Sequence, residues 1–236
     1  MSGLSIFAVR GVGEVGPGDN LAELLTEALD SQGETLVHHD LVVVTSKVVA
    51  KSEGRVVAFD GSEEAKERLI EQESTRILRR RGTLRITETR HGFVNANAGV
   101  DLSNTADGTA VLLPLDPDRS ARRLRADIRR RLDVEVAVVV TDTFGRAWRH
   151  GVTDVAIGAA GLRAVLDLRG SRDANGRVLE ATEVALADEV ASAANLVLAK
   201  NAATPFAVLR GLDDSYFGDG SVGEDIIRSV NNDLFR

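Results

Sequence analysis

The sequence predicts a mixed α/β fold (α+β), and three observations lead to it. Short apolar runs that suit buried strands alternate with segments whose apolar residues recur at helical spacing. Hydrophobic residues make up 43% of the 236 residues, which is close to the globular norm and enough for a sizeable core. The sequence contains no repeat, linker or low-complexity stretch. We therefore expect one domain over residues 1–236. This domain could consist of two closely packed subdomains, but the sequence does not show where one would end and the other begin.

In the N-terminal half, apolar runs predict strands at Ser5–Val9 and at residues 41–44, 84–87 and 110–113. A helix is expected behind the cap candidates Asp19 and Asn20, because the apolar residues that follow repeat at helical spacing. Ser62 is a further cap candidate. It predicts a long charged helix that carries Leu69, Ile70, Ile77 and Leu78.

In the C-terminal half, Asp116 and Pro117 predict the start of a helix, since proline suits the first helical position. This helix extends to about Leu132, and its apolar face consists of Ala121, Leu124, Ile128 and Leu132. Residues 135–140 give the strongest strand signal, five apolar residues after one acid, and the run stops abruptly at Thr141. The remaining signals are a turn at residues 175–176, an alanine-rich helix after Thr182 and a last buried strand at residues 205–209.

The charge and the composition exclude several classes of function. A formal net charge of −7 argues against general binding to nucleic acids or to anionic membranes. The N-terminus lacks the features of a signal peptide, and no apolar run approaches the roughly 20 residues that cross a membrane, so we expect a cytoplasmic protein. Because cysteine is absent, thiolate nucleophiles and cysteine-based metal sites are excluded. A metal ion would need carboxylate, hydroxyl or amide ligands, or one of the four histidines.

The helix after Pro117 is conspicuously basic, with six arginines between residues 122 and 131. A nucleic-acid-binding helix is one interpretation. Its apolar stripe and the negative total charge favour a surface that faces solvent or a second subunit.

Gly11, Gly13 and Gly16 form G-x-G-x-x-G between a predicted strand and a predicted helix, which is the context of a dinucleotide-binding fingerprint. However, Pro17 and Gly18 delay the helix, and the next strand ends in Thr-Ser-Lys where an NAD site needs an acid. A plain turn is favoured. A loop that lends backbone N–H groups to another nucleotide stays open, as does a Rossmann-type NAD(P)-dependent oxidoreductase. The sequence has neither a P-loop motif nor a G-x-S-x-G nucleophile elbow.

Two lysines follow the strand at residues 41–44. If the segment after Ser46 is helical, Lys47 and Lys51 lie on one face, four residues apart. A lysine pair beside the carboxyl end of a strand suits a polyphosphate. The alternative is that both lysines are solvated, as most lysines are.

Residues 95–104 combine small, polar and acidic side chains in one run. Such loops position ligands, because small residues let the backbone approach closely. Asp101 is a candidate metal ligand and Asn104 a candidate hydrogen-bond partner of a nucleotide. An Asx-rich turn is the alternative.

Asp142 is the strongest single candidate, because it follows a buried strand at the edge where α/β proteins usually bind ligands. Thr143 adds a hydroxyl. An acid there and a second acid elsewhere can hold Mg²⁺ or Mn²⁺, with phosphate and water completing the octahedron. The alternative is that Asp142 or Thr143 caps a helix.

Three long motifs in the same order resemble the coenzyme F420-0:L-glutamate ligase family. They are VVVTSKVVAKSEGR at residues 42–55, HGFVNANAGVDLSN at residues 91–104 and VVVTDTFGRAWR at residues 138–149. The closing DLFR at residues 233–236 is also similar, and the resemblance covers roughly residues 5–212 and this tail. One departure is Gly13, where relatives commonly carry proline.

The resemblance implies a set of site residues. The residues that would contact GTP are Val12, Gly13, Glu14, Val15, Ser46, Lys51 and Asn104. The residues that would bind divalent metal are Asp101, Asp142 and Thr143, of which the two acids are also the catalytic candidates. The resemblance further implies Mg²⁺ or Mn²⁺, with K⁺ as an additional candidate, and a homodimer whose fold is specific to the family, neither Rossmann nor P-loop.

The implied reaction is a GTP-dependent amide ligation between L-glutamate and the carboxylate of coenzyme F420-0 or its dehydro form. An acyl phosphate would form and then react with the glutamate amine, and further γ-glutamyl additions could follow. Two other classes stay open: the NAD(P)-dependent oxidoreductase and a regulator that binds GTP without consuming it.

Overall fold

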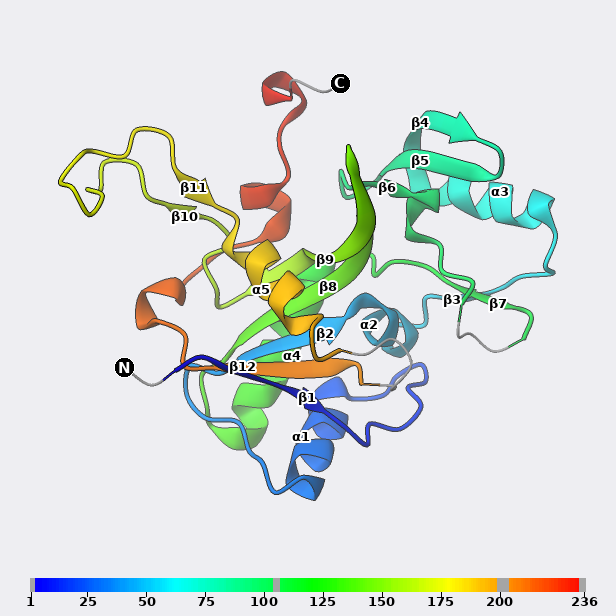
Figure 1. Cartoon of the computed structure of the whole chain (residues 1–236). Helices are drawn as coiled ribbons and strands as arrows, with labels where there is room; N and C mark the ends of the chain where they lie inside the picture. The colour runs from blue at the N-terminus through cyan, green and yellow to red at the C-terminus, as the bar shows by residue number, and fades with distance from the viewer. Residues whose placement is uncertain (1–2, 104–106, 199–203, 234–236) are drawn as a thin grey trace.

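The computed structural model describes residues 3–103, 107–198 and 204–233. Its centre is a five-stranded sheet in the order β1-β12-β2-β8-β9 (Figure 1). Its strands are β1 (Ser5–Val9), β12 (Phe206–Arg210), β2 (Leu41–Thr45), β8 (Ala137–Arg146) and β9 (Arg149–Ala160). β2 and β8 run parallel, whereas the other neighbouring strands run antiparallel. The predicted mixed α/β class is confirmed.

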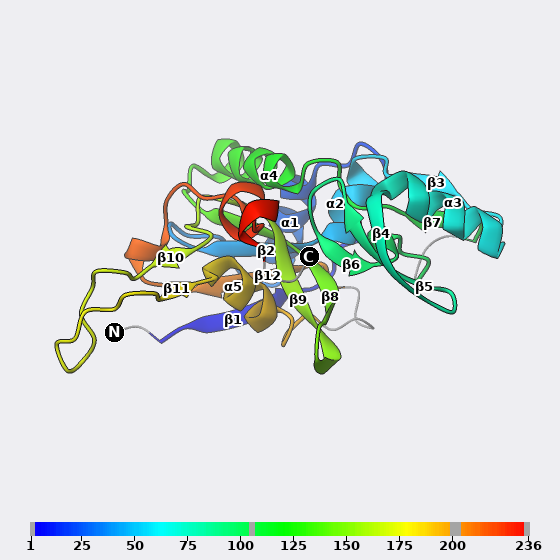
Figure 2. The ribbon, with the colours of Figure 1, turned by 90° about the horizontal axis from the view of Figure 1, so that it is seen from above.

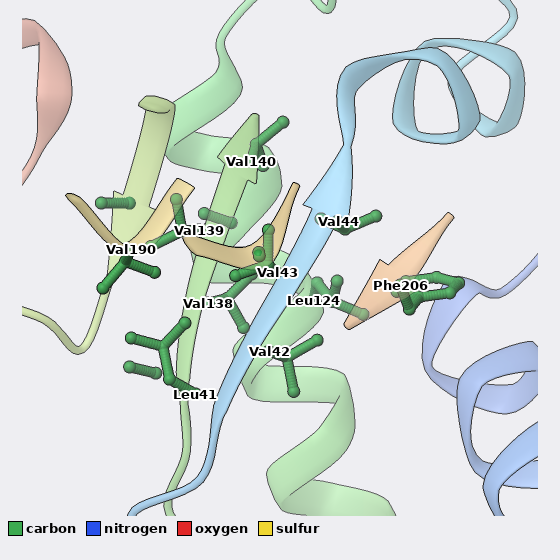
Figure 3. Close-up of a cluster of buried hydrophobic side chains, with 14 of the residues drawn as sticks. Leu41, Val42, Val43, Val44, Leu124, Val138, Val139, Val140, Val190 and Phe206 are labelled. Carbon is green, nitrogen blue, oxygen red and sulfur yellow. The ribbon is translucent and has the colours of Figure 1, made fainter. Parts of the chain in front are cut away.

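The parallel pair β2 and β8 lies at the centre of the core. Leu41 to Val44 and Val138 to Val140 are fully buried. Figure 3 shows these side chains together with Leu124 and Val190, which come from helices of two different segments. Because both faces of the sheet are covered, the two strands read as continuous apolar runs and not as alternating ones. The strand predictions at residues 41–44 and 135–140 rested on this feature.

Three helices pack on the sheet: α1 (Leu21–Ser31), α4 (Pro117–Leu132) and α5 (Leu186–Ala194). α4 and α5 lie on opposite sides of the sheet (Figures 1 and 2), and α1 packs beside α4. Asn20 caps α1, since its Oδ1 accepts hydrogen bonds from two backbone N–H groups of the first turn. Asp116 caps α4 in the same way, with Pro117 at the first helical position. Both caps were predicted.

The segment between β2 and α4 forms a smaller unit at one side of the sheet (Figure 1). Its helices are α2 (Ser46–Ser52), α3 (Glu63–Glu73) and the 3₁₀ turn η1 (Asn97–Gly99). Its strands are β3 (Val56–Ala58), β4 (Ser74–Arg81), β5 (Leu84–Thr89), β6 (Val94–Ala96) and β7 (Thr109–Val111). β4, β5 and β6 form one sheet, and β3 pairs with β7.

The long helix that Ser62 was expected to begin is a wrong prediction in its second half. Ser62 does cap α3, because its hydroxyl accepts the Ala65 N–H, but the helix ends at Glu73. Residues 74–81 instead form β4, which pairs antiparallel with β5. Thr75 and Ile77 are β-branched and suit a strand, and the pairing with β5 overrides the helical spacing.

β8 and β9 form a hairpin that projects beyond the sheet (Figure 2). A register shift between Val140 and Thr141 marks where the hairpin departs from the core. At the tip Arg146 pairs with Arg149, and Trp148 in the turn has a φ of 57° and a surface that is 86% exposed. The hairpin therefore carries an exposed aromatic ring well away from the core.

A second projection is the ribbon of β10 (Leu166–Asp167) and β11 (Glu183–Val184), with the predicted turn at residues 175–176 near its end (Figure 1). The C-terminal segment contains the short turns η2 (Asp214–Tyr216), η3 (Val222–Ile226) and η4 (Val230–Asn232). Asp118 of α4 fastens it, since its carboxylate accepts the Val222 N–H at 2.9 Å and the Ala159 N–H of β9 at 2.8 Å. Within the described ranges, every helix is too short or too polar to cross a membrane.

Candidate active site

The carboxyl end of β2 lies beside the middle of β8. In the parallel register Thr45 lies beside Thr141, and β2 ends there. β8 continues to Arg146, so the prediction that Asp142 follows the end of its strand, or caps a helix with Thr143, is wrong: both residues lie inside β8, paired with β9. Ser46 begins α2, and its Oγ donates a hydrogen bond of 2.9 Å to Oδ1 of Asp142. Two of the predicted site residues, 96 positions apart in the sequence, are thus in direct contact.

The carboxyl group of Asp142 has a raised pKa. Burial raises the pKa of its carboxyl to about 6, and the neighbouring carboxylates of Asp154 and Asp101 act in the same direction. Hydrogen bonds from Ser46 and from the backbone of Thr143 act against this rise in the pKa. The charged form of Asp142 is therefore under-compensated in this structure, and a nearby cation would stabilise it.

Asp101 has the opposite character, because donors hold its carboxylate on both oxygens. Oδ1 accepts hydrogen bonds from the backbone N–H and the hydroxyl of Ser103, at 2.8 and 2.7 Å. Oδ2 lies 2.6 Å from Nζ of Lys47. Burial alone would raise the pKa of Asp101, but these contacts outweigh it and hold the pKa below its ordinary value. The backbone of Asp101 is also fixed, by two hydrogen bonds of 2.9 Å to Val111.

Asp154 is a third acid at this edge, and no pattern in the sequence indicated it. It lies on β9 opposite Thr143, is only 4% exposed, and its Oδ1 accepts a hydrogen bond of 2.7 Å from the Thr143 hydroxyl. It also raises the pKa of Asp142. The signal that could have found it is the hairpin itself: a polar stretch at residues 141–154 folded back on a tight turn places Asp154 beside Thr143.

The glycine-containing loop before α1 lies against α2. Gly18 donates a backbone hydrogen bond of 2.8 Å to Ser52 O, and Glu14 forms an ion pair with Lys51. The Lys51 side chain is 14% exposed, whereas that of Glu14 is 85% exposed. Val15 is buried, so residues 12–15 can offer a ligand their backbone and the Glu14 side chain but not the side chain of Val15. Lys47 and Lys51 share one face of α2, as predicted, and each already has an acidic partner.

Asn104, the last of the candidates for contact with GTP, lies outside the described residues. A cavity of about 140 Å³ opens near the glycine loop, between the start of α1, the end of α2 and α4. Its lining includes Gly18, Ser52 and Arg123 but not Asp101, Asp142 or Asp154. The cluster around Asp142 is therefore separate from this hollow, and its contacts, not a concave shape, mark it as a site.

The oxygen donors suit a hard divalent cation only in part. In the ranges that the structure describes, no three acidic or histidine side chains come close enough to hold a metal ion by themselves. Mg²⁺ and Mn²⁺ sites that also bind nucleotide need one or two carboxylates, with phosphate and water filling the other positions. The carboxylate of Asp101 helps to raise the pKa of Asp142, so the two acids lie within electrostatic reach, and their sharing of one metal ion stays a prediction.

The connection of the strands differs from a dinucleotide-binding fold. There the first two strands are parallel neighbours and the glycine turn leads directly into the helix between them. Here β12 lies between β1 and β2 and runs antiparallel to both. The glycines at residues 11–16 are therefore in a different structural context from the one their spacing suggests.

Comparison with known proteins decides the family. The family model of F420-0:gamma-glutamyl ligase matches residues 11–211. The chain belongs to this ligase family. Among its relatives, a coenzyme F420:L-glutamate ligase of Methanothermobacter thermautotrophicus is 38% identical over 99% of both chains. Proteins of the same name from Methanopyrus kandleri and Halorubrum lacusprofundi are 41% and 40% identical, over 94% and 99% of this chain and 94% and 96% of their own.

Membership of the F420-0:gamma-glutamyl ligase family confirms the resemblance drawn from the three motifs, and the chain is an enzyme of the ligase class. The matched range contains Ser46, Lys51, Asp101 and Asp142. The roles of these residues in binding nucleotide and metal stay predictions.

Proposed function

We propose that the protein forms an amide bond between L-glutamate and the carboxylate of coenzyme F420-0, or of its dehydro form, at the expense of GTP. The observation that carries this proposal is the similarity, along nearly the whole chain, to proteins named coenzyme F420:L-glutamate ligase. The contact between Ser46 and Asp142 at the sheet edge, beside Asp101, supports a site at this place. We also propose that the reaction takes place in the cytoplasm.

The chemistry requires activation, because a carboxylate and an amine do not condense unaided in water. The γ-phosphoryl group of GTP passes to the carboxylate of the coenzyme, which breaks the bond between the β- and γ-phosphates and releases GDP. The glutamate nitrogen then bonds to the acyl carbon, the bond from that carbon to the phosphate oxygen breaks, phosphate leaves with the electron pair, and the amine gives up a proton. No covalent intermediate with the protein is needed, which agrees with a chain without cysteine.

Asp101 and Asp142 are the residues that would hold Mg²⁺ or Mn²⁺, with Thr143 as an oxygen donor of lesser weight. Their hard oxygens and the under-compensated charge of Asp142 fit such an ion. The ion supplies positive charge that offsets the triphosphate and aligns it for in-line transfer. K⁺ is an additional candidate. The protein's own part is to hold the Asp142 carboxylate through the Ser46 hydroxyl and the Asp101 backbone through Val111.

The direct test is an assay with GTP, Mn²⁺, L-glutamate and F420-0, followed by mass spectrometry of the coenzyme. A mass increase of one glutamyl unit, together with one GDP released, supports the proposal, and larger increases reveal further γ-glutamyl additions. GTP binding without consumption would instead favour the regulator. NAD(P) binding that needs no metal would favour the oxidoreductase, although the order of β1, β12 and β2 speaks against it.

Lys51→Ala is expected to raise the KM for GTP by about tenfold or more while the protein stays folded, because one ammonium group facing phosphate is lost. Steady-state kinetics at varied GTP checks this. The loss also frees the Glu14 carboxylate to repel phosphate, so Glu14→Gln in the same variant separates the two effects. Lys66→Ala is the matched control, since Lys66 pairs with Glu63 on α3. A KM for GTP that is unchanged in Lys51→Ala contradicts the role of Lys51.

We further propose a homodimer, as the family resemblance implies. The two projections of the chain support it, because they expose apolar side chains: Trp148 and Val152 on the β8–β9 hairpin and Val178 on the ribbon, which are 86%, 58% and 51% exposed. Light scattering at micromolar concentration should give about twice the monomer mass of 25.2 kDa. A monomer mass under these conditions contradicts the dimer.

A further inference from the structure

Lys47 occupies the place where a cation would meet Asp101. Its Nζ lies 2.6 Å from Oδ2 of Asp101 and donates a second hydrogen bond of 2.7 Å to the carbonyl oxygen of Ser103. The Lys47 side chain is 25% exposed, so it is held against the loop and does not extend into solvent. The sequence offered Lys47, with Lys51, to a polyphosphate, but the contact with Asp101 is not used by any role assigned above.

The contacts of Asp101 show what a divalent cation must displace. Ser103 holds Oδ1 through two donors, and Lys47 holds Oδ2. A divalent cation at Oδ2 would lie within a few ångströms of the Lys47 ammonium, and two positive charges at that separation repel strongly. Asp101 therefore accepts a metal ion only when the ammonium moves away from it.

The position of Lys47 on α2 indicates where the ammonium can go. Lys47 is the second residue of α2 and lies one turn from Lys51, on the same face. Both lysines already pair with acids, Lys47 with Asp101 and Lys51 with Glu14. A triphosphate bound along this face would offer new partners to Lys47 when it leaves Asp101.

We propose that Lys47 is an exchangeable counter-ion: it neutralises Asp101 in the ligand-free protein and passes to the nucleotide phosphates when a divalent cation takes its place. This inference rests on the proposed function. Its consequence is thermodynamic coupling. The metal ion alone binds weakly because it must displace Lys47, whereas metal and nucleotide together bind well because the phosphates receive the ammonium.

The test measures Mn²⁺ affinity of the full chain by electron paramagnetic resonance of free Mn²⁺, with and without a non-hydrolysable GTP analogue. In the wild type, the analogue should tighten Mn²⁺ binding by about tenfold or more. In Lys47→Met, Mn²⁺ alone should bind about tenfold more tightly than in the wild type, and the gain from the analogue should shrink. Lys47→Gln provides a second neutral variant if the methionine variant does not fold, and Lys47→Arg, which keeps the charge, should behave like the wild type.

Lys51→Met is the matched control, because Lys51 lies on the same face of α2 but pairs with Glu14 instead of an acid of the cluster. It should weaken the analogue and leave the affinity for Mn²⁺ alone unchanged. If the neutral Lys47 variants bind Mn²⁺ alone no more tightly than the wild type, the exchange is wrong although the proposed function stands. If the wild type binds no Mn²⁺ even with the analogue, the proposed metal and nucleotide site itself is wrong.

Discussion

Asp142→Asn is expected to lower kcat/KM for ligation by about three orders of magnitude or more while the protein stays folded. The substitution keeps the shape of the side chain and an acceptor for the Ser46 hydroxyl, but it removes the negative charge. Charge placed where a phosphoryl group is transferred usually carries the largest single share of catalysis. Single-turnover and steady-state measurements with GTP, Mn²⁺, glutamate and F420-0 check the result. Asp60→Asn, at an exposed position in the loop before α3, should keep wild-type activity.

The same variant should be more stable than the wild type when no ligand is present. The folded-state pKa of Asp142, about 6, lies above the ordinary value of 3.8, so the folded protein binds this proton more tightly than the unfolded chain does. Stability that is present below about pH 4 is therefore lost as the pH rises through 6. Because Asp142 is partly exposed, we expect about 1–2 kcal/mol in favour of Asp142→Asn at pH 7 and almost no difference at pH 4.

Denaturant unfolding at both pH values measures this difference in the free energy of unfolding. A gain in stability together with a loss of activity would show that the carboxylate is kept for function at a cost to the fold. Ligation within tenfold of the wild type, or an Asp142→Asn protein less stable than the wild type at pH 7, would falsify the role given to this residue.

Gly158→Ala should have the largest effect on folding. Gly158 lies on β9 where the strand crosses the first turn of α4. A Cβ atom there would lie 2.7 Å from the backbone N of Asp118, and closer still to the carbonyl group of Pro117. These are backbone atoms, which cannot move aside as a side chain does, so strand and helix must separate. We expect a loss of about 3–5 kcal/mol, which is a fall in Tm of roughly 10 °C or more, or failure to accumulate in soluble form.

Gly145→Ala is the control, because a Cβ there meets no atom within 4 Å and Gly145 has no positive φ. Its Tm should stay within about 1–2 °C of the wild type. Thermal unfolding followed by circular dichroism compares the two variants. A Gly158→Ala protein that melts within 2 °C of the wild type would contradict the close packing of β9 on α4.

The parts of the fold that could be predicted from the sequence are those whose burial leaves a local pattern. β2 and β8 are covered on both faces and read as apolar runs, and α4 shows its cap, its proline and its apolar stripe. Residues 74–81 could not be assigned correctly, because leucine and isoleucine at helical spacing also fit an edge of a small sheet. What decides the outcome is pairing with β5, which no local pattern contains.

In the candidate site, too, some residues could be predicted from the sequence and others could not. Ser46 directly follows β2, and Asp142 lies within β8, whose apolar first half the sequence reveals. Parallel pairing of the two strands brings the two residues together. Asp154 reaches the same place through the projecting part of the hairpin, where residues 141–154 give no continuous apolar signal. The contact between Lys47 and Asp101 depends on the turn after β6 and on the bridge from Asp101 to β7. Such contacts arise from tertiary structure and become visible only when the chain is folded.

The exposed tip of the β8–β9 hairpin also gives the protein an optical reporter. Trp148 is the single tryptophan of the chain, so the indole fluorescence of the whole protein comes from one ring, which is 86% exposed and stands on the hairpin that bears Asp142 and Asp154. Emission from such a ring lies at long wavelength and is readily quenched by acrylamide. A second subunit or a bound coenzyme that covers the tip would move the emission to shorter wavelength and protect it from the quencher. Assembly and substrate binding can thus be followed in unlabelled protein.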